Sequence, residues 1–182
     1  MLRRRPLGEK PILYAVTVVS SLAAVLLTGV MTGVFFAFAI SVMPGLNAVP
    51  PRSAVAAMQA INRRIQNAVF FIALFGAPVA ALAAGACYVG LDAALPAAAM
   101  FASAAFYLIG AMGPTIGINV PLNRKLDRGG TPPDDDAATR LWTEFSVRWS
   151  RANVVRACFS AISLLTAALA LFWRGWNMAM MG

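Results

Sequence analysis

Histidine is absent from this 182-residue chain, and cysteine occurs only twice, at Cys87 and Cys158. The absence of histidine removes the commonest metal ligand in proteins, the usual haem ligand and the usual general base. The two cysteines lie inside apolar stretches, are too few for a four-ligand zinc site and indicate no disulfide framework. We therefore expect a protein that holds no metal.

Charged residues are also scarce: they make up 12% of the chain, against about 25% in an ordinary soluble domain. Hydrophobic residues make up 60%, and the mean hydropathy is +0.72. These values exclude a disordered chain and argue against a soluble globular domain. The net charge of +8 is not accompanied by alternating basic and aromatic residues, so we expect no nucleic-acid partner. In membrane proteins an excess of Lys and Arg lies at the ends of the spans.

Four apolar stretches are each long enough to cross a bilayer, which takes about 20 residues. They cover residues 11–43, 68–89, 93–116 and 154–173 approximately. In lipid each must be a helix, because a helix satisfies its own backbone hydrogen bonds. The sequence therefore predicts an all-α fold, a bundle of four transmembrane helices that forms one integral membrane domain over residues 1–182. Arg3, Arg4 and Arg5 resemble the start of a signal peptide, but the apolar run exceeds the roughly 7–15 residues of such a signal.

The connections between these stretches differ greatly in length. Stretches two and three are joined by a few residues near Gly90, whereas the other two connections cover residues 44–67 and 117–153. With an even number of crossings, both long connections lie on the same side of the membrane. A count of positive charges favours the cytoplasm for that side, although the N-terminal arginines argue for the opposite orientation. We expect both connections to be amphipathic helices, and any site to lie at their end of the bundle.

The connection before the fourth stretch carries one polar and aromatic face. Three consecutive acids, 134–136, are well placed at the positive end of a helix. At 100° per residue one face then holds the following residues: Trp142, Ser146, Trp149, Asn153 and Arg156. Glu144 lies on the opposite side, four residues from Arg140 and from Arg148, which favours a solvated ion pair. The face itself is either an interfacial aromatic belt with Arg156 reaching lipid headgroups, or the wall of an interior site.

The first long connection predicts a second amphipathic helix, which Ser53 can cap after two prolines. Asn62 lies on its polar face, and Asn67 lies at the entry to the second stretch. The helix either lies on the membrane surface or contributes to a site. In the second long connection, Asn119 and Asn123 flank Pro121, which should break the helix. Their amides either satisfy the freed backbone groups or point into a cavity.

Taken together, these segments resemble the anthrone oxygenase-like family of small integral membrane proteins, whose bacterial members are mostly domains of unknown function. The resemblance covers residues 33–156 approximately. It rests on 43–46 (MPGL), 57–62 (AMQAIN), Asn67, Phe70, 119–123 (NVPLN), Trp142, Trp149 and 153–156 (NVVR). One departure is Ala152, where the family pattern has an aromatic residue in many relatives. The resemblance implies a multi-pass protein of the bacterial plasma membrane.

The resemblance also implies a function: a cofactor-independent monooxygenase that oxidises a hydrophobic polycyclic or quinone-like substrate with O2. Arg156, Asn123 and Asn62 would then stabilise the enolate oxygen of the substrate. The substrate-binding residues would be Trp142, Trp149, Asn153, Asn119 and Asn67. The general base is unassigned, because Glu144 points away. The alternative is a non-catalytic membrane protein that binds a lipid or quinone or serves as a partner subunit. The expected partners are thus a hydrophobic small molecule and the lipid bilayer, with a homo-oligomer left open.

Overall fold

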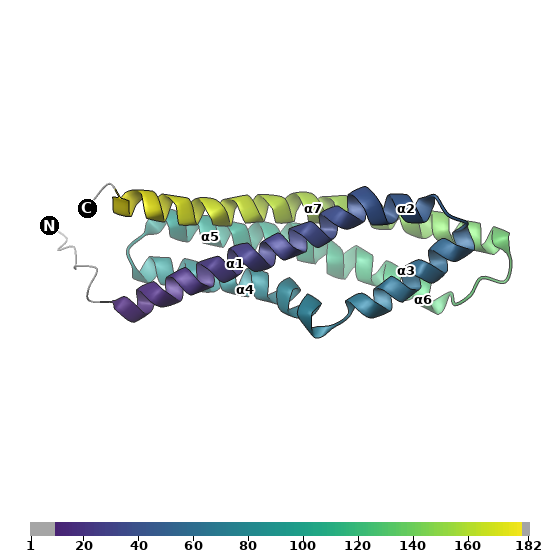
Figure 1. The fold of residues 1–182 in the computed structure, drawn as a ribbon, viewed down its shortest axis with the longest axis horizontal. Coiled ribbons are helices and arrows are strands. Elements are labelled where there is room, and N and C mark those ends of the chain that lie inside the picture. Colours follow the sequence, from purple (N-terminus) through teal and green to yellow (C-terminus); the bar gives the residue numbers. More distant parts are fainter. Residues whose placement is uncertain (1–9, 180–182) are drawn as a thin grey trace.

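The computed structural model describes residues 10–179, and their side chains as far as Gly175. Within this part of the chain every regular element is a helix, which confirms the all-α fold. Four long helices run along one another, and the chain passes up and down the bundle (Figure 1). Arg3, Arg4 and Arg5 lie outside the described residues.

Each long helix contains one of the four predicted apolar stretches. The first is formed by α1 (Pro11–Ala37), η2 (Phe38–Val42) and α2 (Met43–Asn47), and the second by α4 (Ala68–Gly90). The third is formed by α5 (Ala94–Tyr107), η3 (Leu108–Met112), η4 (Thr115–Asn119) and α6 (Val120–Arg128), and the fourth is α7 (Asp135–Ala179). α1 packs against α4 and α7, and α5 packs against the same two helices. All four are long and apolar enough to cross a membrane.

The outer surface of the bundle is apolar over most of its length. Side chains such as Leu26, Ile72, Ile109 and Leu165 are each more than 60% exposed. Contiguous exposed apolar surface of this kind is rare on soluble monomers, and in a membrane it faces lipid tails. The chain is an integral membrane protein whose helices bury small and polar residues inside and present large apolar ones outside.

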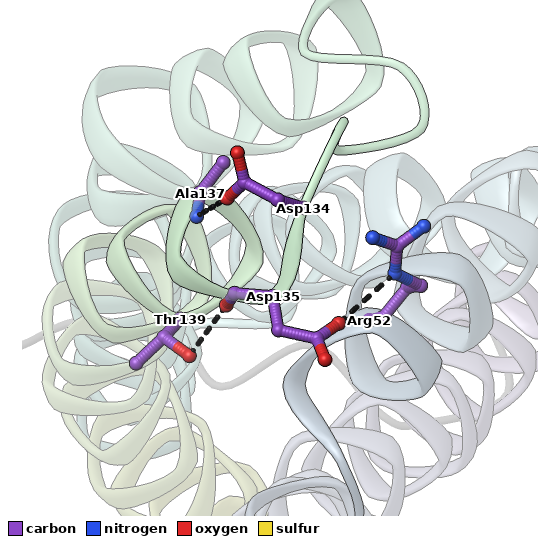
Figure 2. Close-up of polar contacts among 5 residues, drawn as sticks. All are labelled: Arg52, Asp134, Asp135, Ala137 and Thr139. Carbon is purple, nitrogen blue, oxygen red and sulfur yellow. Dashed lines mark hydrogen bonds and ion pairs between the residues drawn. The ribbon is translucent and has the colours of Figure 1, made fainter.

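The two long connections lie at the same end of the bundle, as predicted, and the described ends of the chain lie at the other end (Figure 1). The first connection forms α3 (Pro51–Ile65), which packs against α6 and α7. An ion pair between Arg52 Nε and Asp135 Oδ1, 3.3 Å apart, joins the beginning of α3 to the beginning of α7 (Figure 2). Both connections are therefore ordered helices that cover the end of the bundle.

The beginnings of these helices test two predictions about capping. The acids of 134–136 do begin α7, and Asp134 Oδ1 accepts a hydrogen bond of 2.7 Å from the Ala137 N–H (Figure 2). The prediction that Ser53 caps α3 is wrong: the N-cap residue is Pro50, without a side-chain cap, and the helix begins at Pro51. Proline is favoured in the first turn because its missing N–H has no helical partner there, so Ser53 already lies inside the helix.

The predicted helix break at Pro121 is also wrong. The third long helix continues through Pro121 into α6, after two π-helical turns, η3 and η4. A π turn bonds each N–H five residues back and is wider than an α turn. Because η4 ends at Asn119 and Pro121 is the second residue of α6, the proline takes a place where a helix tolerates the loss of one N–H. The polar residues around Pro121 thus stay on one continuous helix.

Three clusters of buried side chains hold the bundle together, one of which contains Phe35 and Tyr107. Near the chain ends the core consists mainly of alanines, with Tyr88 and Met100. At the end covered by α3 and α6, the core is aromatic and contains Trp142, Phe145 and Trp149, together with methionine, valine and leucine side chains. The next subsection describes the cavity that lies beside this aromatic cluster.

Candidate functional site

A cavity of about 280 Å³ lies between α1, α3, α4, α6 and α7, at the end of the bundle covered by the connections. Five of the eight predicted site residues line it: Asn62, Asn119, Asn123, Trp149 and Arg156. They come from three helices that are distant in the sequence, so tertiary packing brings them together. The other lining residues are Val34, Phe35, Phe38, Ile65, Gln66, Phe70, Phe71, Leu74, Thr115, Val120, Arg124 and Asp127.

Arg156 is the charged group in the interior wall of this cavity, and it is 5% exposed. Its Nη1 donates a hydrogen bond of 3.2 Å to Thr115 Oγ1, and its Nη2 donates one of 2.8 Å to Asn153 Oδ1. The guanidinium carbon lies 4.5 Å from the ring centre of Phe35 and 5.1 Å from that of Trp149. Aromatic faces attract a cation by their quadrupole, so four groups fix the position of the guanidinium.

The positive charge of Arg156 lacks an acidic partner within the described residues, since none of their carboxylates lies within 4.0 Å of it. Its Nε–H also has no hydrogen-bond partner. A buried charge without an acidic partner is costly. The surroundings of Arg156 therefore suit contact with a negatively charged ligand atom.

Three asparagines add polar groups to the same cavity. Asn62 is 2% exposed and its Nδ2 lacks a partner, and the Oδ1 of buried Asn119 lacks one as well. Asn119 Nδ2 donates to the Trp149 carbonyl at 3.2 Å, while Asn123 Oδ1 accepts a hydrogen bond of 2.8 Å from Trp149 Nε1. Asn119 and Asn123 therefore fix Trp149 to α6, and do not serve freed backbone groups of their own helix. Buried polar atoms without partners are few in native proteins, which makes the amides of Asn62 and Asn119 candidates for ligand contact.

The rest of the cavity wall is apolar and largely aromatic. The rings of Phe38 and Trp149 lie 5.3 Å apart, centre to centre, at an angle of 45°. Phe71 lines the cavity and is also 41% exposed, so the wall reaches the outer surface at the beginning of α4. The neighbouring outer residues Ile72 and Phe75 are exposed and apolar. An apolar ligand dissolved in the bilayer would meet this part of the protein first.

Three predicted site residues lie outside the cavity lining. Trp142 is buried in the aromatic cluster, where its Nε1 donates to Asn47 Oδ1 at 2.9 Å. Asn153 is fully buried between the Phe35 carbonyl and Arg156, so it positions the guanidinium. Asn67 is exposed and is the N-cap of α4: its Oδ1 accepts from the Phe70 N–H at 3.1 Å. The side chains of these three residues have structural partners in the protein.

The sequence reasoning missed a carboxylate. Asp127 lines the cavity, and Arg63 Nη1 lies 3.8 Å from its Oδ1. It follows Asn123 by four residues on α6, so the helical period would have placed both on one face. Glu144 forms its ion pair with Lys125, at 2.5 Å, and not with Arg140 or Arg148. Phe35, Phe38 and Thr115 were missed too, since an apolar stretch does not distinguish inner from lipid-facing aromatics.

The arrangement has a clear chemical preference. A buried cation, amide groups without partners and flat apolar walls suit a flat apolar molecule that carries an anionic oxygen. Within the described part of the chain, no three Cys, Asp or Glu side chains gather in a group that could hold a metal ion.

A family model described as anthrone oxygenase matches residues 64–166, which is more than half of the chain. The matched segment contains α4 to α6 and most of α7, and hence every cavity residue except Asn62 and those of α1 and η2. No curated protein and no solved structure matches.

Proposed function

The chain belongs to the anthrone oxygenase family, and on that premise we propose that it oxidises a hydrophobic polycyclic or quinone-like substrate with molecular oxygen and without a cofactor. The substrate class is an anthrone or a similar hydroxylated arene, in which a carbon next to aromatic rings is acidic. Loss of a proton from that carbon gives an aromatic enolate, which is electron-rich enough to react with oxygen. One oxygen atom enters the product as a carbonyl group, and the other leaves as water with the two hydrogens lost from the carbon.

One observation carries this proposal: the buried guanidinium of Arg156 faces the cavity without a carboxylate partner. The substrate oxygen is neutral in the ground state and becomes negatively charged as the enolate forms. Arg156 would therefore stabilise the transition state more than the ground state. Groups positioned in this way before the reaction are the largest single source of catalysis in many enzymes. The unpaired Nδ2 of Asn62 would add a second donor.

The ring system of the substrate would lie between Phe35, Phe38 and Trp149. These rings exclude water, which strengthens the interaction between Arg156 and the enolate. Asn153 and Thr115 would have a positioning role, because their side-chain oxygens accept hydrogen bonds from the guanidinium. The protein would thus supply binding, charge stabilisation and a dry site, while oxygen supplies the oxidising power.

The test is turnover of an anthrone under air by the detergent-purified protein, followed by the absorbance of the quinone product. We expect a rate above that of spontaneous oxidation, and a loss of about 100–1000-fold in kcat/KM in Arg156→Gln. Arg148→Gln is the matched control, because Arg148 is an exposed arginine on the opposite face of the same helix. Arg156→Lys keeps the charge without the two-pronged geometry, and should retain more activity than Arg156→Gln.

Two results would overturn the proposal: no turnover above the spontaneous rate across a panel of anthrones and hydroquinones, or full activity in Arg156→Gln. Binding of these compounds without turnover, detected by quenching of tryptophan fluorescence, would assign the cavity to quinone or lipid binding instead. Binding should then still weaken in Arg156→Gln, since the cavity offers the same cation to either kind of ligand.

A further inference from the structure

The oxidation begins with the loss of a proton from carbon, which requires a base, and α6 brings a carboxylate to the cavity. From the end of η4 along α6, the residues that line the cavity are Asn119, Val120, Asn123, Arg124 and Asp127. This spacing is that of one helical face. Asp127 is the last of them, one turn of about 5.4 Å beyond Asn123.

The carboxylate of Asp127 has a charged neighbour, Arg63, and one of its oxygen atoms makes no hydrogen bond. Its Oδ1 is a buried atom without a hydrogen-bond partner. Arg63 Nη1, on α3, lies 3.8 Å away, which is within ion-pair distance and beyond hydrogen-bond distance. The side chain of Asp127 is 33% exposed, so it can exchange protons with water at the cavity rim. A base needs both features: a free lone pair toward the substrate and a route for the proton to leave.

No other carboxylate of the described residues lines this cavity. Glu144 is 53% exposed and paired with Lys125 outside it. Asp134 and Asp135 cap or tie the beginning of α7, and Asp92 lies in the turn after α4, at the opposite end of the bundle. The charged groups around Asp127 are Arg63 from α3, Arg124 from its own helix and Arg156 from α7; α1 and α4 contribute uncharged lining residues.

The positions of Asp127 and Arg156 are linked by a series of contacts along one wall. The guanidinium lies 5.1 Å from the Trp149 ring, Trp149 Nε1 bonds to Asn123 at 2.8 Å, and Asp127 follows one helical turn later. Asp127, Trp149 and Arg156 therefore all belong to the lining of one cavity. In an anthrone the acidic carbon and the oxygen lie opposite each other across the central ring, so such a substrate needs a base and a cation at two different points of its site.

We propose that Asp127 is the base that removes the proton from the substrate carbon, while Arg156 receives the negative charge on the oxygen. This inference rests on the proposed oxidation. As the C–H bond breaks, the proton passes to Asp127 Oδ1 and the electron pair moves into the rings and onto the oxygen. Molecular oxygen then bonds to that carbon as a peroxide, which takes the proton back from Asp127. Loss of the second carbon-bound proton, again to Asp127, breaks the O–O bond and forms the carbonyl. The departing hydroxide takes this proton from Asp127 and leaves as water, so the carboxylate is restored.

Proton transfer can be measured apart from oxidation. In D2O under argon, the wild-type protein should exchange the carbon-bound hydrogen of an anthrone for deuterium faster than buffer does, as followed by NMR. Asp127→Asn should lower the enzymatic exchange rate by about 100-fold or more, which is the usual contribution of a positioned base. Substrate binding, measured by quenching of tryptophan fluorescence, should stay within a few-fold of wild type. Asp127→Glu should restore part of the rate.

Glu144→Gln is the matched control, since it also removes one carboxylate near α6 but lies outside the cavity. Full exchange and turnover in Asp127→Asn would overturn the role of Asp127 and leave the proposed oxidation intact. Exchange without oxidation in wild type would overturn the oxidation and keep Asp127 as a proton acceptor. A wild-type protein that neither exchanges nor oxidises would overturn both.

Discussion

Near the described chain ends the four long helices meet through small side chains, whereas at the other end large aromatic side chains lie between them. In the first region Ala24, Ala84, Ala104 and Ala170 are each no more than 1% exposed. In the second, Trp142, Phe145 and Trp149 fill the space beside a cavity of about 280 Å³. Interaxial distances between helices depend on the side chains at the contact, so one chain builds a closely packed half and a hollow half from the same kind of helix.

The two regions also differ in how they treat buried polar groups. In the alanine-rich region Ser103 and Ser163 bond to each other's carbonyls, at 2.9 and 2.8 Å, and Ser21 bonds to the Tyr88 hydroxyl. Around the cavity, atoms of Asn62, Asn119, Asp127 and Arg156 lack partners. Unpaired buried groups lower stability, so the groups around the cavity reduce the stability of the hollow half. The difference agrees with the proposed site in the hollow half.

The largest effect on stability is expected from overfilling the packed half. Ala84→Leu adds three carbon atoms to a fully buried position, and such overpacking costs about 1–3 kcal/mol. The Tm in detergent should fall, while kcat/KM of the folded protein should be unchanged. Ala83→Leu on the exposed face of the same helix is the control. Equal Tm values for the two variants would show that this half is not closely packed.

A substitution in the hollow half should raise the stability of the protein instead of lowering it. Asn62→Leu replaces a buried donor that has no partner, and removal of such a group is worth about 1 kcal/mol. We expect a higher Tm together with lower turnover, measured on the same preparation. Asn67→Ala is the contrasting variant, because it removes the N-cap hydrogen bond of α4. It should lower the free energy of unfolding by a similar amount, and the Tm with it, and leave turnover per folded protein unchanged. A lower Tm in Asn62→Leu would contradict the view that the cavity is destabilising.

The smallest effect is expected for the hydroxyl pair of the packed half. Ser103→Ala and Ser163→Ala each remove one donor, at about 1 kcal/mol each. Because the hydroxyl oxygens also lie 2.9 Å from each other, the double variant should lose less than the sum of the two, by a double-mutant cycle on thermal unfolding. Strict additivity would mean that the two hydroxyls act independently. Turnover should be unaffected in all three variants.

The bundle could be predicted from the sequence because a lipid bilayer allows few kinds of backbone structure. A stretch of about 20 apolar residues in a bilayer has to be a helix, and the lengths of the connections then decide which ends lie together. The polar face of α7 was also predictable. A period of 100° per residue placed Trp142, Trp149, Asn153 and Arg156 on one side, and all four are buried.

Which residues of that face line the cavity was not predictable. Trp142 and Trp149 are two helical turns apart on the same side of α7, yet Trp149 lines the cavity and Trp142 is bonded to Asn47 beyond it. Periodicity gives the side of the helix on which a side chain lies. Whether that side chain reaches the cavity depends on how α1 and α3 pack against α7. The break expected at Pro121 likewise concealed that Asn119 shares a helical face with Asn123 and Asp127, which follow the proline.

The π turns η3 and η4 have a consequence for how such a cavity can change over generations. Each π turn holds an extra residue without breaking the helix, so it is an insertion that the fold has absorbed. Because the wider turn takes up the extra residue locally, the loss of that residue would leave the following side chains on nearly the same faces. Conversion of a π turn to an α turn without such a loss would instead rotate the helix after it by about 100°. Asn123 and Asp127 would then turn away together, and a different set of α6 side chains would face the cavity. A change within residues 108–119 that straightens a π turn can therefore replace a whole wall of the site, with no substitution in the wall itself.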